Sequence, residues 1–201
     1  MDKDTIFKLI GIIGACLRGK QLRFERESTL SQALTSTMAY PDRAIRIEFL
    51  NNLKELQSYL TCTSEDLLDV VLAGCSDSSP QVKLASLKAI PTATTASSSS
   101  SSREGLTLCV PQTALDVKVM RAVLKLTADE DAGIRANLPI LLAKLAPLLS
   151  SSAYAKSVPQ VLTKSINDPF VHTRISALRS TLAIARGEKV TSSQLACHFM
   201  P

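Results

Sequence analysis

The sequence predicts an all-α fold made of stacked helix pairs, and three observations support this prediction. Of the 201 residues, 45% are apolar but only 4% are aromatic, and tryptophan is absent. Such a composition suits helices packed by aliphatic side chains better than a β-sandwich. Apolar residues recur at helical spacing in one segment after another. A short acidic and basic motif also returns about every forty residues, which is the period of a helical repeat protein.

Four copies of this motif define the repeat. In each copy an acidic residue and a short turn precede an apolar residue that is followed by a cation, and in the fourth copy His172 and Thr173 stand between Val171 and Arg174. The successive cations are 37, 52 and 39 residues apart, and leaving out residues 92–102 shortens the long step to 41. This period predicts a HEAT/armadillo-type solenoid of about four helix pairs plus an incomplete terminal repeat. The acids and cations are Asp42 and Arg46, Asp77 and Lys83, Asp131 and Arg135, and Asp168 and Arg174.

Each cation begins a predicted helix with one apolar stripe. A shorter helix is predicted ahead of each, over residues 28–40, 64–76, 113–128 and 153–167, and a further helix over residues 4–17. Ser64 is a candidate N-cap, because its hydroxyl can accept a hydrogen bond from the first helical turn. The stripes are Ile45, Phe49, Leu53, Leu56 and Leu60; Val82, Leu84, Leu87 and Ile90; Ile134, Leu138, Leu142, Leu145 and Leu149; and Ile175, Leu178, Leu182 and Ala185.

Three features interrupt the repeat. Pro139 and Pro147 fall within the helix that follows Asp131 and are expected to kink it, since proline removes a backbone hydrogen bond. Residues 92–103 include a run of six serines and are predicted to form a disordered insertion, because they have almost nothing to bury. Residues 188–201 are interpreted as the truncated start of a further repeat. The predicted organisation is therefore HEAT-like repeats over 1–91 and 104–187, with the insertion between them.

Cysteine usage and hydropathy exclude several kinds of site. The five cysteines are scattered without a C-x-x-C pair, and there are only two histidines, so neither structural zinc nor a disulfide framework is expected. No apolar run reaches the about twenty residues that a membrane span needs. We expect a soluble intracellular protein with no metal, cofactor or small-molecule substrate. The net charge of +5 permits an anionic partner but does not require one.

A catalytic site is not predicted either. Ser193, Cys197 and His198 crowd one incomplete helix, and no nucleophile-elbow motif surrounds the serine. His172 lies in the turn before Arg174 and lacks the neighbours that a metal ligand would need. We interpret it as a turn or helix-start residue.

At its repeats the sequence resembles the middle region of the N-terminal kinase-like proteins, the Scy family of pseudokinases. The resemblance covers residues 6–200, with the serine tract and Pro139 as departures. The most specific residues are Asp168-Pro169-Phe170 at the start of a repeat helix. The other residues that carry it are Asp42-Arg43-Ala44-Ile45-Arg46 with Leu50, the stretch 131–137 with Leu142, Lys144 and Leu145, and Arg174, Ala177 and Leu178.

The resemblance implies a non-catalytic scaffold. Family members join a catalytically weak kinase-like domain to HEAT repeats and act with the COPI coat in Golgi-to-ER traffic, and some take part in nuclear tRNA export. The chain has no Val-Ala-x-Lys strand, no His-Arg-Asp catalytic loop and no Asp-Phe-Gly motif, so the parts that hold nucleotide and magnesium are missing. We therefore predict that it is not an enzyme and that its partners are coat or trafficking proteins.

Two groups of charged residues are candidates for function. The repeated acids and cations are expected to form a structural ladder, in which acids cap helix starts and cations reach neighbouring turns. The densest basic run is the second candidate, for contact with RNA or a partner, although Glu25 and Glu27 dilute it. Its cations are Arg18, Lys20, Arg23 and Arg26.

Alternatives to the trafficking scaffold stay open. One is a tRNA-binding adaptor in nuclear export, which requires cations on one face and salt-sensitive binding. Another is an inactive truncated gene product. The predicted location is the cytoplasm, with peripheral association at the Golgi, or a position near the nuclear pore for the export role.

Overall fold

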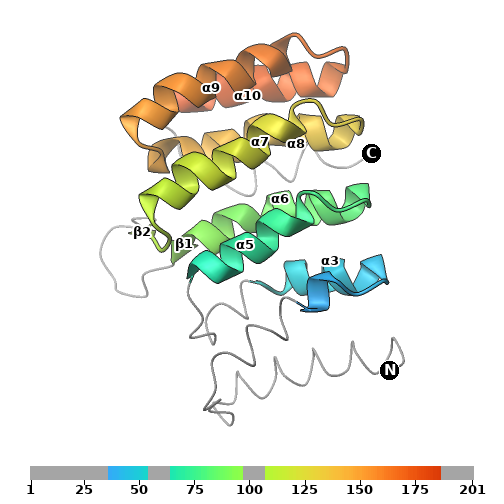
Figure 1. Cartoon of the computed structure of the whole chain (residues 1–201). Helices are drawn as coiled ribbons and strands as arrows, with labels where there is room; N and C mark the ends of the chain where they lie inside the picture. Colours follow the sequence, from blue (N-terminus) through green and yellow to red (C-terminus); the bar gives the residue numbers. More distant parts are fainter. Residues whose placement is uncertain (1–35, 54–63, 97–106, 187–201) are drawn as a thin grey trace. The chain divides into compact units, whose positions relative to one another are not determined.

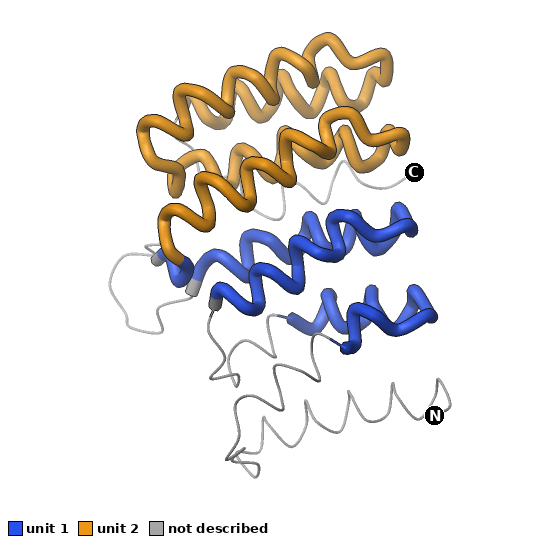
Figure 2. The backbone as a smooth tube through the Cα atoms, in the orientation of Figure 1, with its two compact units in different colours: residues 1–110 blue, residues 111–201 orange. Residues whose placement is uncertain are grey.

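The computed structural model describes residues 36–53, 64–96 and 107–186. The chain divides into two compact units, Met1–Val110 and Pro111–Pro201 (Figure 2). This boundary lies two residues after a short strand, β2 (Thr107–Leu108). It is therefore later in the chain than the insertion at 92–103 that the sequence predicts. The predicted terminal segment 188–201, the helix at 4–17 and most of the helix at 28–40 lie outside the described residues.

The described part of unit 1 comprises a helical hairpin and one additional helix. Helix α5 (Ser64–Gly74) and helix α6 (Pro80–Thr94) are joined by a short turn and pack side by side (Figure 1). Helix α3 (Arg43–Asn51) packs against α6. Asp42 caps α3, because its Oδ1 accepts a hydrogen bond from the backbone N–H of Ala44 at 2.8 Å. Acidic Glu65 and Asp66 lie in the first turn of α5, where the helix dipole favours negative charge.

In unit 2 the described residues, 111–186, form two helical hairpins. A π-helical segment η1 (Ala114–Val119) continues directly into α7 (Met120–Leu126), and α8 (Ala132–Leu145) follows and ends in a 3-10 turn η2 (Ala146–Leu148). Helix α9 (Ser151–Ile166) and helix α10 (Val171–Arg186) form the second hairpin. Within this unit α7 packs beside α9 and α8 beside α10, so the helices form two layers (Figure 1).

The cores are aliphatic, as the composition predicts. In unit 1 the largest fully buried side chains include Ile45, Phe49 and Ile90, and in unit 2 they include Leu138 and Leu142. Burial of such side chains stabilises each by roughly 1.5–3 kcal/mol relative to exposure. The described part of the chain is thus all-α in class, apart from one small ladder.

That ladder corrects the expected start of the insertion. Helix α6 runs to Thr94, and β1 (Thr95–Ala96) pairs antiparallel with β2 (Thr107–Leu108). Thr94 is buried, and its hydroxyl donates to the carbonyl of Ile90. Residues 92–96 therefore belong to regular structure, because Ala93 and Thr94 lie in the core while the serines begin only at position 97.

The two prolines after Asp131 differ in their structural effect. Pro139 lies inside α8 and is buried. Pro147 instead lies in η2, and α8 ends at Leu145. The observed helix α8 is therefore shorter than the predicted one, and Leu149 lies outside it. Pro91 and Pro159, within α6 and α9, are two further helical prolines.

Within the described ranges, no helix is long and apolar enough to cross a membrane.

Candidate interaction surface

Three repeat arginines bind the turn that precedes their own helix. Each donates from Nη1 to two successive backbone carbonyls, six and five residues earlier. Arg135 donates to Asp129 at 2.8 Å and to Glu130 at 3.1 Å, and Arg174 donates to Asp168 at 2.9 Å and to Pro169 at 2.8 Å. We call this arrangement the carbonyl clamp. Its third example is Arg46, which donates to Tyr40 and Pro41.

Two of these arginines also reach the turn of the next helical hairpin. Arg135 holds Asp168, 33 residues later, through Nε to Oδ2 at 2.7 Å and Nη2 to Oδ1 at 3.2 Å. Arg46 holds Asp77, 31 residues later, through Nη2 to Oδ1 at 3.0 Å. The Nε of Arg46 lies 2.8 Å from Oδ2, but its N–H is not aligned with it, so that contact is ionic. Each bidentate pair joins two successive turns within one unit.

The four acids of the predicted ladder occupy two different positions. Asp42 and Asp131 are N-caps, and the Oδ1 of Asp131 accepts from the N–H of Ile134 at 3.1 Å. Asp77 and Asp168 lie two residues before the start position that Asp42 and Asp131 occupy in their own helices. Each accepts a hydrogen bond from the N–H two residues on, at 2.8 Å, and another from the arginine of the preceding hairpin or helix.

Asp129 shares the position of Asp77 and Asp168, since it lies six residues before its repeat's cation and accepts from the N–H of Asp131 at 3.0 Å. Asp129 is not among the four acids of the predicted ladder, although counting back six residues from Arg135 identifies it. Lys83 is the half-buried cation of α6 at the clamp position.

The pair of Arg135 and Asp168 is electrostatically coupled. The hydrogen bond from Arg135 lowers the pKa of Asp168, against an opposing effect of burial. The same hydrogen bond raises the pKa of Arg135. Asp168 is 8% exposed, so little of it is available to a partner.

Helix α10 presents a second candidate surface, which is exposed to solvent. The apolar stripe predicted for this helix, Ile175, Leu178, Leu182 and Ala185, lies on its exposed side, and Val171 at the start of the helix is also exposed. Ile175 is 39% exposed, Leu178 60% and Leu182 49%. The side of α10 that packs within the unit carries smaller residues, Thr173, Ala177 and Ser180, all of them buried. We call the set Val171, Ile175, Leu178 and Leu182 the α10 stripe.

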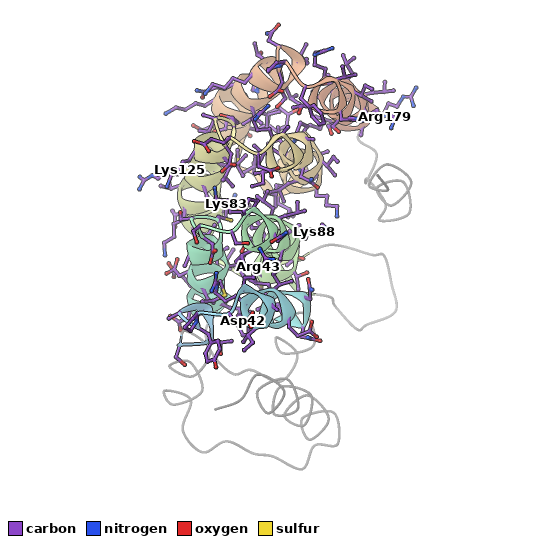
Figure 3. The ribbon with its side chains drawn as sticks, turned by 90° about the vertical axis from the view of Figure 1, so that its right-hand side faces the viewer. Asp42, Arg43, Lys83, Lys88, Lys125 and Arg179 are labelled. Carbon is purple, nitrogen blue, oxygen red and sulfur yellow. The ribbon has the colours of Figure 1, made fainter. Side chains whose placement is uncertain are left out.

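Cations accompany the α10 stripe. Between Ser151 and Arg186 the sequence has five Lys and Arg, and its one acid is Asp168, which Arg135 already holds. Arg179 is exposed and lies beside the stripe, projecting from α10 (Figure 3). Lys156 and Lys164 are exposed on α9. The terminal hairpin of unit 2 thus combines an apolar strip with positive charge.

The basic run predicted to contact RNA or a partner, Arg18, Lys20, Arg23 and Arg26, lies outside the described residues. The described residues contain no group of three or more His, Cys, Asp or Glu side chains placed to hold a metal ion. Cys75 is buried, and its burial raises the pKa of the thiol to about 12, so it stays protonated and unreactive at neutral pH.

The described helices pair into hairpins within each unit, and α10 leaves an apolar and basic face exposed. A solved structure, the crystal structure of Cex1p, resembles this chain with a TM-score of 0.67 and 24% sequence identity. The match covers 88% of this chain and 32% of Cex1p, a member of the SCY1-like pseudokinase family. The chain thus spans about a third of the length of that relative. No protein-family model and no curated protein matches the sequence.

Proposed function

We propose that this chain is a non-catalytic HEAT-repeat scaffold fragment that binds protein partners in COPI-dependent Golgi-to-ER traffic. The observation that carries the proposal is the α10 stripe, because a large exposed apolar strip on a helix is a feature of protein-binding surfaces. The likeness to part of Cex1p and the family resemblance of the repeats support the scaffold class. The trafficking role itself rests on the sequence resemblance alone.

The repeat solenoid is part of this proposal. Its support is the recurrence of the carbonyl clamp with the same six- and five-residue spacing at Arg46, Arg135 and Arg174. Two of the three arginines then hold an aspartate of the next turn. A nearest-neighbour contact that recurs in this way is what stacks repeats in a solenoid.

The trafficking proposal is tested with coat subunits. The tagged full chain is immobilised and incubated with purified COPI coat, and bound subunits are detected by immunoblot. We expect the chain to retain coat subunits. An unrelated helical-repeat protein of similar charge, the control, should retain clearly less. Absence of coat binding at micromolar concentrations of both proteins would contradict the trafficking role.

A tRNA-binding adaptor is the second candidate, favoured by the exposed cations Lys156, Lys164 and Arg179. Such binding should weaken steeply with salt, by a log-log slope of about 0.7–0.9 for each neutralised phosphate. Filter binding of labelled tRNA across a salt series distinguishes the candidates. Specific tRNA binding near physiological salt, lost on replacing Arg18, Lys20, Arg23 and Arg26 by Ala, would reverse our ranking.

A further inference from the structure

The α10 stripe occupies positions that α8 buries. Counted from the clamp arginine of each helix, the first, fourth and eighth following residues are Ala136, Pro139 and Ala143 in α8. These three are buried, with Ala136 and Ala143 less than 8% exposed. In α10 the same positions are Ile175, Leu178 and Leu182. The face of α10 that corresponds to a packed face of α8 therefore carries larger apolar side chains and is left exposed.

The length and spacing of the stripe fit a helical occupant. Its residues follow one another at intervals of four, three and four, which places them on one side of α10. From Val171 to Leu182 they extend along about 16 Å of helix axis at 1.5 Å per residue. Helices in this unit already pack side by side along their lengths, as α8 and α10 do. A partner helix laid along α10 would cover the stripe in the same manner.

Charge decides between possible occupants. Helices α9 and α10 contain no acidic residue, and Arg179 is exposed beside the stripe. A second copy docked through the same face would bring these cations together. Residues 188–201 of this chain contain one acid, Glu188, directly beside Lys189, so this segment offers no net negative charge. Only an occupant that carries its own acids offers the complementary charge.

We propose that the α10 stripe binds an amphipathic helix of a partner protein, apolar along one side and acidic beside it. This inference rests on the proposed scaffold function and adds the chemistry of the partner. The apolar side would cover Ile175, Leu178 and Leu182, and the acidic side would pair with Arg179. The interaction is the helix-on-helix mode of peptide recognition.

Two designed peptides provide the probe. Both are helical and carry Leu on one side, and they differ only in having Glu or Lys at the flanking positions. Fluorescence polarisation measures their binding to the purified full chain at moderate salt. We expect the Glu peptide to bind at least about tenfold more tightly than the Lys peptide, which is 1.4 kcal/mol.

Variants of the chain locate the site. The double substitution Leu178→Ser and Leu182→Ser should weaken the Glu peptide at least about tenfold, because it removes two apolar contacts. Val117→Ser is the matched control, since Val117 is 52% exposed in the same unit but lies on η1; it should leave binding unchanged. Arg179→Glu should reduce the preference for the Glu peptide and improve binding of the Lys peptide. Circular dichroism confirms that each variant keeps its helices.

Three outcomes would overturn the inference. Equal binding of the Glu and Lys peptides would show that the surface does not select an acidic partner. Displacement of the Glu peptide by tRNA, dependent on Arg179, would make the surface a polynucleotide site. A dimer in sedimentation that Leu178→Ser and Leu182→Ser abolishes would make the occupant a second copy.

The coat-binding experiment separates this inference from the proposed function. If the Leu178→Ser and Leu182→Ser chain retains coat subunits as well as the wild type does, the scaffold role stands and the α10 stripe is not the site it uses. If the wild type binds the Glu peptide but no coat, the surface stands and the trafficking role fails.

Discussion

Helices α8 and α10 lie side by side in unit 2 and begin with the same kind of turn, yet they bury different amounts of apolar side chain. In both, an arginine clamps the two carbonyls five and six residues earlier. In α8 the residues Ile134, Leu138 and Leu142 are at most 1% exposed. In α10 the largest side chains, such as Leu178, face outward. The local motif that begins a repeat helix therefore does not determine which faces of it become buried.

The buried side of α10 explains the difference. Thr173 and Ala177 stand where α8 has Ile134 and Leu138, counted from the clamp arginine. These smaller residues are fully buried and pack α10 within the unit. The apolar stripe, turned to the opposite side, then has no described element over it. An amphipathic helix such as α10 can thus bury the face that carries its small residues and leave its larger apolar side chains exposed, when neighbouring helices cover only one face.

The largest effect is expected from a matched pair of leucines. Leu142→Ala should destabilise the protein by about 3 kcal/mol, because a fully buried side chain is lost and a cavity remains. Leu178→Ala should change the free energy of unfolding by less than about 0.5 kcal/mol, because that side chain is largely exposed. Urea unfolding followed by circular dichroism measures both. Comparable losses would mean that the α10 stripe is covered in solution.

The clamp arginines provide a second pair. Arg135→Met should cost about 2 kcal/mol, since it removes the carbonyl bonds and leaves the buried carboxylate of Asp168 unpaired. Arg174→Met should cost only about 1 kcal/mol, because among the described residues Arg174 hydrogen-bonds to carbonyls alone. Chemical unfolding of both variants at one pH makes the comparison. Equal costs would show that the carbonyl bonds, and not the pair with Asp168, dominate.

Acid should weaken the contact between the turns of α8 and α10. The pKa of Asp168 is lower in the folded protein than in the unfolded chain, so the unfolded state takes up the proton first as pH falls. Its stabilising contribution is complete above the unfolded pKa of about 3.9 and is lost as pH falls through the folded pKa. The free energy of unfolding should therefore fall more steeply between about pH 5 and 2 for the wild type than for Asp168→Asn. Parallel pH profiles would exclude this contribution.

The smallest effect is expected at Thr173, where α10 departs from the apolar residue of α8. Its Oγ1 is buried and has no hydrogen-bond partner among the described residues. Thr173→Val keeps the shape and removes the unpaired hydroxyl, so it should stabilise the protein by about 1 kcal/mol. Thermal unfolding of the variant shows whether the protein is stabilised or destabilised, and Thr181→Val, at an exposed threonine of the same helix, is the control. Destabilisation by Thr173→Val would indicate a bound water or another partner at Oγ1.

Local elements were predictable because short-range features specify them. The predicted segment 64–76 corresponds to α5, and 153–167 corresponds to α9 within two residues at each end. Asp42 and Asp131 act as helix caps, which requires only the adjacent backbone. In contrast, the end of α6 at Thr94 depends on burial in unit 1 and on pairing of β1 with β2 across the insertion. Composition alone therefore placed the start of the insertion, residue 92, before the end of α6.

The sequence by itself determined the helical class and the caps Asp42 and Asp131, because apolar spacing and caps act over one or two turns of chain. Only the tertiary structure decided that Arg46 and Arg135 hold an aspartate more than thirty residues away, and that the α10 stripe faces outward. These outcomes depend on which helices stack as neighbours. An amphipathic pattern states that a helix has an apolar face, but the surrounding helices decide whether that face is covered.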